Sequence, residues 1–147
     1  MSSDAALSGA PVIARDPDGL PVPRGFSQTM TVGDLVFVSG QLPVNAAREL
    51  VGGDDAVAQT RQVFHNLEVA LQANGLGLQD IVKFTALVVT NAAYEAFRDV
   101  RDELIQPPFP TSTVACVTEI VIPGAVIEID VVAAPRSGRE SGSDDQA

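Results

Sequence analysis

Short apolar runs rich in β-branched and aromatic residues recur along the chain, and this pattern predicts β-strands. The expected strands cover residues 27–32, 35–39, 80–90, 113–122 and 125–133, with an optional sixth near residues 11–15. A tight turn at Gly33-Asp34 joins the first two strands, and a turn at Pro123-Gly124 joins the last two.

Between these strands, two segments place apolar residues at the spacing of a helix face. In the first segment, the apolar residues between Val57 and Leu71 fall near a period of 3.6 residues. Asp54 or Asp55 is the expected N-cap of this helix, and Asn74-Gly75 is expected to end it.

The second expected helix carries apolar residues between Tyr94 and Leu104, with Asn91 as its N-cap and Pro107-Pro108 ending it. Arg101 interrupts the apolar face of this helix, where a charge is costly unless it is paired or open to a cleft. Its side chain either binds a ligand or has a structural role, as a snorkelling group or in an ion pair between subunits.

The order β-β-α-β-α-β-β indicates an α+β fold: a mixed sheet of five or six strands with two helices on one face. The other face of the sheet cannot simply be wet if it is as apolar as Val36, Val38, Val114 and Val131 suggest. We therefore expect sister subunits to cover that face through a large, obligate interface.

Both ends of the chain lack the apolar surface that would offset the entropy of ordering them. We expect disorder in residues 1–11 and in the acidic tail of residues 137–147. Residues 12–136 contain neither a linker nor an internal repeat, so they are expected to form a single domain.

Charge and composition exclude several classes of partner. The chain has 19 acidic and 9 basic residues, for a net charge of −10, and the excess of acid extends through the body of the domain. A nucleic-acid or anionic-membrane surface normally requires a basic face, so neither partner is expected. No apolar run is long enough to span a membrane, no secretory signal is recognised, and the single cysteine fits a reducing cytoplasm.

Several short motifs, in this order along the chain, resemble the Rid (YjgF-like) family of reactive-intermediate deaminases. They are Gly25-Phe26-Ser27-Gln28, Val38-Ser39-Gly40-Gln41, Gln59, Asn66-Leu67, Leu71 to Gly75, Asp80 to Lys83, Pro107 to Val114 and Ile127 to Asp130. The resemblance implies a chorismate-mutase-like fold, a homotrimer with three ligand clefts between subunits, and hydrolysis of enamines or imines such as 2-aminoacrylate to ketoacids and ammonia.

One departure from the family pattern bears on the substrate. In the active subgroup an arginine near the start of the penultimate strand binds the substrate carboxylate, and here Ser112 stands at that position. A serine cannot supply the charge of a guanidinium. The chain therefore resembles the Rid subgroups that lack this arginine, and 2-aminoacrylate is expected to be a poor substrate.

The resemblance implies that Glu128 is the catalytic acid or base, since one positioned carboxyl group suffices for enamine hydrolysis. From the residues alone, Glu128 and Asp130 are more simply acidic groups on a solvent-facing strand, and for Asp130 that interpretation stands. Ser39 and Ser112 are expected to orient the ligand, Phe26 to wall the cleft, and Arg101 to replace the missing guanidinium. Thr113 is either a ligand donor or bonded to its neighbouring strand.

No cofactor is expected. One histidine and one cysteine cannot form a metal site of usual composition, and no glycine-rich phosphate loop occurs. The alternative to an enzyme is a non-catalytic module that binds a small metabolite in the same clefts. A ribonuclease, which older naming in the family suggests, is disfavoured by the net charge.

Overall fold

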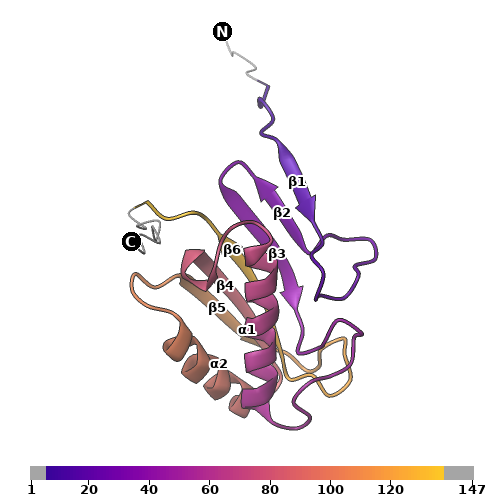
Figure 1. Ribbon diagram of the computed structural model, residues 1–147. Helices are drawn as coiled ribbons and strands as arrows, with labels where there is room; N and C mark the ends of the chain where they lie inside the picture. The colour runs from indigo at the N-terminus through magenta and orange to yellow at the C-terminus, as the bar shows by residue number, and fades with distance from the viewer. Residues whose placement is uncertain (1–5, 138–147) are drawn as a thin grey trace, which may run out of the picture.

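The computed structural model describes residues 6–137, and its elements follow the expected order (Figure 1). The strands are β1 (Val12–Arg15), β2 (Thr29–Val32), β3 (Leu35–Gln41), β4 (Ile81–Val88), β5 (Thr111–Cys116) and β6 (Ile127–Ala133). The helices are α1 (Ala56–Gln72) and α2 (Asn91–Leu104), with a 3-10 turn, η1 (Leu78–Asp80), before β4. Residues 1–5 and nearly all of the tail that we expect to be disordered lie outside the described residues.

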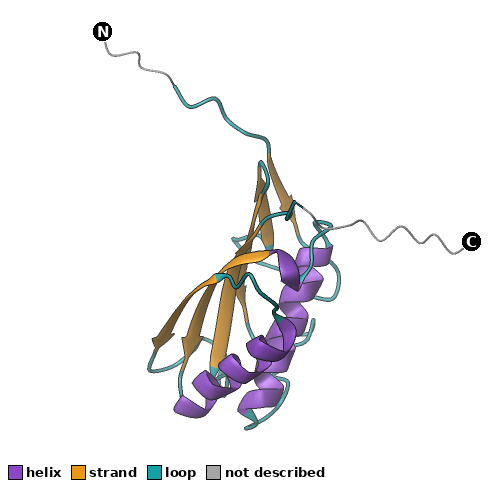
Figure 2. Cartoon of the chain, turned by 90° about the vertical axis from the view of Figure 1, so that its left-hand side faces the viewer, coloured by secondary structure: helices purple, strands orange, loops and turns teal. Residues whose placement is uncertain are grey.

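The strands form one six-stranded sheet in the order β1-β2-β3-β6-β4-β5. Neighbouring strands are antiparallel except β4 and β5, which are parallel and are connected through α2. Both helices lie on the same face of the sheet, and no helix covers the other face within the described chain (Figure 2). The predicted α+β fold with a mixed sheet and two helices on one face is confirmed.

The expected hairpin of residues 113–122 and 125–133 is wrong, because β4 lies between β5 and β6 in the sheet. β5 ends at Cys116, and the chain then crosses the end of β4 before it enters β6 on the other side. The turn at Pro123-Gly124 belongs to this crossing segment, where Gly124 has a φ of 83°.

Side chains at the helix starts satisfy backbone N–H groups that have no partner within the helix. The Asp55 carboxylate accepts hydrogen bonds from the N–H groups of Val57 and Ala58, so one of the two expected caps of α1 is correct. The cap of α2 is Thr90, whose hydroxyl accepts from the Ala93 N–H, and not Asn91. Thr90 has the extended backbone of an N-cap, and Asn91 is already helical.

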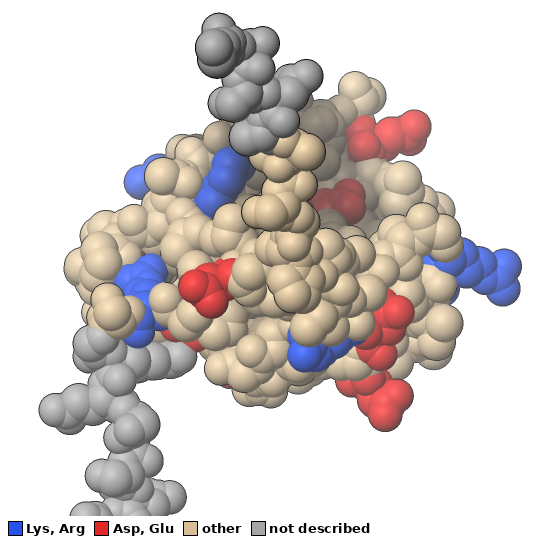
Figure 3. Space-filling view, turned by 90° about the horizontal axis from the view of Figure 1, so that it is seen from above, with Lys and Arg blue, Asp and Glu red and all other residues tan. Residues whose placement is uncertain are grey.

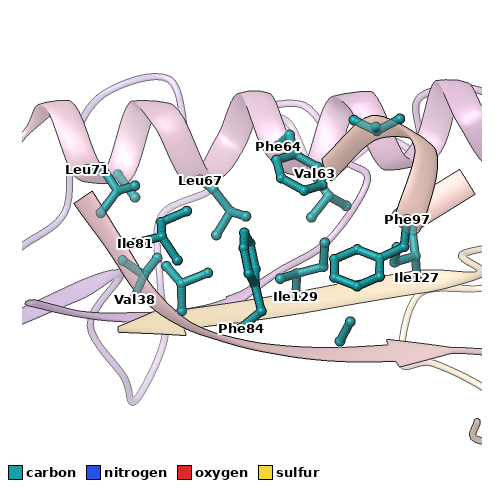
Figure 4. Packing of buried hydrophobic residues seen from close by; sticks show 14 of the residues in the cluster. Val38, Val63, Phe64, Leu67, Leu71, Ile81, Phe84, Phe97, Ile127 and Ile129 are labelled. Atoms are coloured by element: carbon teal, nitrogen blue, oxygen red, sulfur yellow. The ribbon is translucent and has the colours of Figure 1, made fainter. Parts of the chain in front are cut away.

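The core lies between the sheet and the helices, and three phenylalanines from three elements meet in it (Figure 4). Phe84 points from β4 toward α1, and its ring centroid lies 5.9 Å from that of Phe64 and 5.8 Å from that of Phe97. All three side chains are buried. This cluster fixes α1 and α2 over β4, and with them the position of α2 beside β5.

The face of the sheet that bears no helix, here called the open face, is lined by other residues than those the sequence suggested. Val36, Val38 and Val131 are buried on the helix side, because strand residues alternate between faces. The intervening Leu35 and Phe37 lie on the open face and are 43% and 44% exposed. Their cross-strand partners Met30, Val32 and Val132 share this face, so its apolar surface comes from these residues.

Candidate functional site

Glu128 lies on β6 at the open face, where the backbone of β3 leaves room for its carboxylate. Its neighbours Ile127 and Ile129 are buried on the helix side, whereas Glu128 is half-buried. A Cβ atom placed on Gly40 of β3 would lie 2.3 Å from the Glu128 Oε1 atom, well inside contact distance. The absent side chain of Gly40 therefore forms the notch that holds the carboxylate.

The notch coincides with an irregularity in the pairing of β3 with β6. Val38 pairs with Val131 and Gln41 with Ile129, so that two residues of β3 oppose one residue of β6. Such a bulge bends a strand and redirects its side chains. Ser39, the other residue in the bulge, donates its hydroxyl proton to the Ser27 carbonyl at 2.6 Å. Toward a ligand, the Ser39 oxygen is thus available as an acceptor.

Burial raises the pKa of Glu128 above its ordinary value of 4.5, and the negative charge of Asp130 two residues away raises it further. A carboxyl group whose pKa is raised retains its proton to higher pH, which suits it to act as a general acid. The same environment makes the ionised form unfavourable in the folded protein.

This raised pKa predicts how Glu128→Gln affects stability. The folded state binds the Glu128 proton more tightly than the unfolded state, so this stabilisation is complete below pH 4.5 and is lost as pH rises through the folded pKa. Glutamine carries no charge to bury, so Glu128→Gln should raise the melting temperature at pH 7 but not at pH 4. Thermal unfolding at both pH values tests this, and an equal shift at both would contradict it.

Gly40→Ala should displace the Glu128 carboxylate without unfolding the protein. The atom that the new methyl group meets is the end of a flexible side chain, which can move at small cost. We expect a melting temperature close to that of the wild type and a changed Glu128 pKa, measured by NMR titration of its side-chain carbon. An unchanged pKa would show that the notch does not position the carboxylate.

Phe26 lies in the segment before β2 and is exposed. It lines a small pocket of about 60 Å³ together with Gly40, Gln41 and Arg48. Among the other residues that line this pocket, Gln41 donates a side-chain hydrogen bond of 2.9 Å to Gln28. The Arg48 guanidinium donates to the Val22 carbonyl. Phe26 is therefore placed beside Gly40, near the notch that holds Glu128.

The neighbouring residues Ser112 and Thr113 lie on opposite faces of β5. Ser112 pairs with the buried Phe84, on the side of the helices, and Thr113 pairs with Thr85, which in turn pairs with Asp130 on the open face. Thr113 thus shares the open face with Glu128, and Ser112 does not. A single copy of the chain cannot bring Ser112 and Glu128 to one ligand.

Ser112 instead lines a cavity of about 800 Å³ between α2 and β5, here called the α2–β5 cavity. Arg101 and Arg98 enter it from α2, and Cys116 enters it from the end of β5. Cys116 is exposed, because β5 is an edge strand. Arg101 and Ser112 also line an adjoining cavity of about 450 Å³.

Arg101 is held over the buried core rather than pointing freely into solvent. Its guanidinium carbon lies 5.3 Å from the centre of the Phe97 ring, and its Nη2 atom lies 2.8 Å from the Asp102 carboxylate. Asp102 is 63% exposed, so this ion pair contributes little to stability. The alternative of an ion pair between Arg101 and another subunit stays a prediction.

The predicted site residues therefore form two groups. Glu128, Ser39, Phe26 and Thr113 belong to the open face and its β3 end, whereas Arg101 and Ser112 belong to the α2–β5 cavity. The sequence did not reveal that Gly40 makes space for Glu128. Arg98 lies three residues before Arg101, a spacing that places the two arginines on one helix face.

Within residues 6–137, no three histidine, cysteine, aspartate or glutamate side chains are grouped as a metal site would require. Nor does any helix in this part of the chain have the length and apolar character needed to cross a membrane.

Comparisons with known proteins show which sequences this chain is similar to. Residues 20–135 match a family model described as Endoribonuclease L-PSP. The chain is 34% identical over 123 residues to a RutC family protein of Sinorhizobium fredii, a match that covers 83% of this chain and 94% of that one. It is 35% identical over 119 residues to the 2-iminobutanoate/2-iminopropanoate deaminase of Escherichia coli, covering 76% and 88% of the two chains.

Solved structures agree with these matches. A conserved Rid family protein from Yersinia pestis has 26% identity and a TM-score of 0.78 over 85% of this chain and all of that one. The YjgF gene product of E. coli has 27% identity and a TM-score of 0.72 over 84% of this chain and 99% of that one.

Proposed function

Because the chain belongs to the Rid/YjgF family, whose sequence model is described as Endoribonuclease L-PSP, we propose that it hydrolyses small reactive imines or enamines to a carbonyl compound and ammonia. The observation that carries this proposal is Glu128, a half-buried carboxyl group of raised pKa in a notch made for it by Gly40. The 2-iminobutanoate/2-iminopropanoate deaminases among its relatives support the reaction class.

In this reaction Glu128 moves the protons. For an enamine, the protonated carboxyl group gives its proton to carbon, and the C=C–N system becomes an iminium ion. The carboxylate then takes a proton from water as the water oxygen bonds to the iminium carbon. The carboxyl group then gives this proton to the nitrogen of the resulting carbinolamine and takes the hydroxyl proton, so that the C–N bond breaks, ammonia leaves and a C=O bond forms. For an imine, the sequence begins with protonation of nitrogen. No net proton is consumed by the protein.

Ser112 restricts the range of substrates that the chain can bind. We propose that the chain represents a Rid subgroup without the carboxylate-binding arginine, so that 2-aminoacrylate and other short imino acids are poor substrates. A serine hydroxyl offers a neutral hydrogen bond where a guanidinium would offer two charged ones. A larger substrate with additional contacts is favoured.

The placement of the site residues supports an assembly, and we propose the homotrimer that the family resemblance implies. Ser112 and Glu128 lie on opposite sides of one sheet, so a ligand touching both needs the α2–β5 cavity of one copy against the open face of another. Leu35 and Phe37 supply the apolar surface for such contacts. The ligand clefts would then lie between subunits.

Phe37→Lys should weaken this assembly. A lysine at an apolar interface introduces a charge that is desolvated on association, whereas in a monomer it stays in water. Size-exclusion chromatography with light scattering should show a trimer for the wild type and smaller species for the variant. Val57→Lys, an exposed apolar residue of α1 on the helix side, is the matched control and should remain trimeric. A monomeric wild type would contradict the proposed cleft.

The family name mentions a ribonuclease, but charge does not favour RNA as the substrate of this chain. On the face seen in Figure 3, basic and acidic side chains are interspersed, with no continuous basic stripe. The net charge of −10 opposes approach of a polyphosphate backbone. The single cysteine and this acidity support action on small metabolites in the cytoplasm.

Imines generated in situ test the function. An amino-acid oxidase acting on a series of amino acids supplies imines of increasing size, and release of ammonia is measured against the spontaneous rate. We expect acceleration that Glu128→Gln abolishes and that is weakest for the imine of alanine. Turnover of that small imine at the rate of an arginine-bearing relative would overturn the substrate preference. Ligand binding without acceleration of any imine would instead support the metabolite-binding module.

A further inference from the structure

We propose that the α2–β5 cavity binds the carboxylate of an organic acid larger than a three-carbon imino acid, through the guanidinium groups of Arg98 and Arg101. This inference rests on the proposed function, because it names the substrate class of the same cleft. It assigns the charge that Ser112 cannot supply to two side chains of α2.

The charge of the cavity is opposite to that of the molecule. The chain has a net charge of −10, yet this cavity is lined by two arginines and, among the described residues, by no aspartate or glutamate. Low-dielectric walls strengthen the potential inside such a cavity and concentrate ions of opposite charge there. An anion is therefore the ligand that the lining favours.

Both guanidinium groups are available and partly oriented. Arg98 lies over the ring of Tyr94 on its own helix, with 5.6 Å from the guanidinium carbon to the ring centre, and Arg101 lies over Phe97. The hydrogen bonds of Arg101 to Asp102 in the described chain use Nε and Nη2, which leaves both N–H groups of Nη1 for a ligand. Stacking restricts each side chain before binding and lowers the entropy cost of holding an anion.

The dimensions of the cavity indicate the size of the acid. Its lining on α2 runs from Thr90 to Arg101, which corresponds to roughly 16 Å along a helix that rises 1.5 Å per residue. Its volume of about 800 Å³ is typical of sites for ligands much larger than pyruvate. Val114 and the Tyr94 ring provide an apolar surface for the body of the acid, and the Ser112 hydroxyl provides a neutral donor.

Binding can be measured without turnover by using unreactive probes. Isothermal titration calorimetry of the full chain would compare 3-phenylpropionate with its neutral analogue 3-phenylpropionamide and with the shorter propionate. We expect the acid to bind at least about tenfold more tightly than the amide, the loss typical when a charge-assisted hydrogen bond is replaced. Propionate should bind more weakly than 3-phenylpropionate, because it leaves the apolar walls uncovered.

Variants then assign the binding to the two arginines. Arg101→Gln should lower the affinity for 3-phenylpropionate at least about tenfold, and Arg98→Gln should lower it severalfold. Arg101→Lys should retain part of the affinity. Arg61→Gln is the matched control: it removes the same charge from an exposed arginine of α1 that pairs with Glu103 at 2.9 Å. We expect this control to change the affinity less than about twofold, because exposed charges at a distance are screened by salt.

The outcomes separate this inference from the proposed function. Equal affinity for acid and amide, no binding at millimolar concentration, or equal losses in Arg101→Gln and Arg61→Gln would overturn the carboxylate site. Selective binding of the acid by a protein that accelerates no imine hydrolysis would support the site and overturn the proposed function. Imine hydrolysis that Arg98→Gln and Arg101→Gln leave unchanged would support the proposed function and overturn the carboxylate site.

Discussion

Glu128→Gln should reduce imine hydrolysis by about 10²- to 10⁴-fold, the usual contribution of a positioned general acid or base. Glutamine keeps the shape of the side chain and fits the space beside Gly40, but it can neither give a proton to carbon nor take one from water. The fold should survive, since the substitution removes a charge that is unfavourable when buried. The measurement is kcat/KM for ammonia release on the best imine of the series.

Asp130→Asn is the matched control, because it neutralises an exposed carboxylate two residues away on the same strand. It should retain most of the activity. The Asp130 charge helps to raise the Glu128 pKa, so its loss should move the activity profile that depends on Glu128 protonation toward lower pH. Equal losses in the two variants would contradict a specific role for Glu128.

Phe84→Ala should destabilise the folded protein by about 3–5 kcal/mol, the range for removing a buried phenylalanine. The ring is completely buried and contacts both Phe64 of α1 and Phe97 of α2, so no single neighbour can move to fill the cavity. Denaturant unfolding of wild type and variant measures the difference. Val57→Ala on the exposed side of α1 is the control and should change stability by less than about 0.5 kcal/mol.

A loss below about 1 kcal/mol in Phe84→Ala would mean that α1 and α2 close over the vacated space. In that case the position of Arg101, whose guanidinium stacks on Phe97, would change as well. Activity and stability of this variant are therefore informative together. If the variant is stable but no longer binds organic acids, a changed orientation of α2 is the cause of the lost binding.

Much of the fold could be predicted because local patterns report local structure. Helical spacing located α1 and α2 nearly to their ends, and β-rich runs located most strands. Pairing between strands is not local: nothing in residues 113–133 shows that β4 lies between β5 and β6. Val36 and Val38 were expected on the open face but lie on the helix side, for a related reason. Alternation along a strand separates its residues into two faces but does not say which face the helices cover.

The candidate site was predictable only in part. Glu128, Ser112 and Arg101 were predicted from a family resemblance and from a charge that interrupts an apolar helix face, and their roles stay predictions. The notch at Gly40 depends on a bulge between distant strands, and it has no signature in the sequence other than the glycine itself. Strand alternation places Ser112 and Thr113 on opposite faces of the sheet. This difference separates the two candidate groups of site residues only when the positions of α2 and Glu128 are known.

The central place of β6 has a consequence for folding of the chain. β6 is the last strand of the described chain, yet it lies between β3 and β4 and joins the β1-β2-β3 meander to the β4-β5 pair. Without β6, the inner edges of β3 and β4 lack a strand partner, because each of them pairs with β6 on that side. Docking of this strand closes the sheet and brings Glu128 to Gly40 in one step, so we expect completion of the sheet and formation of the notch to be coupled during folding.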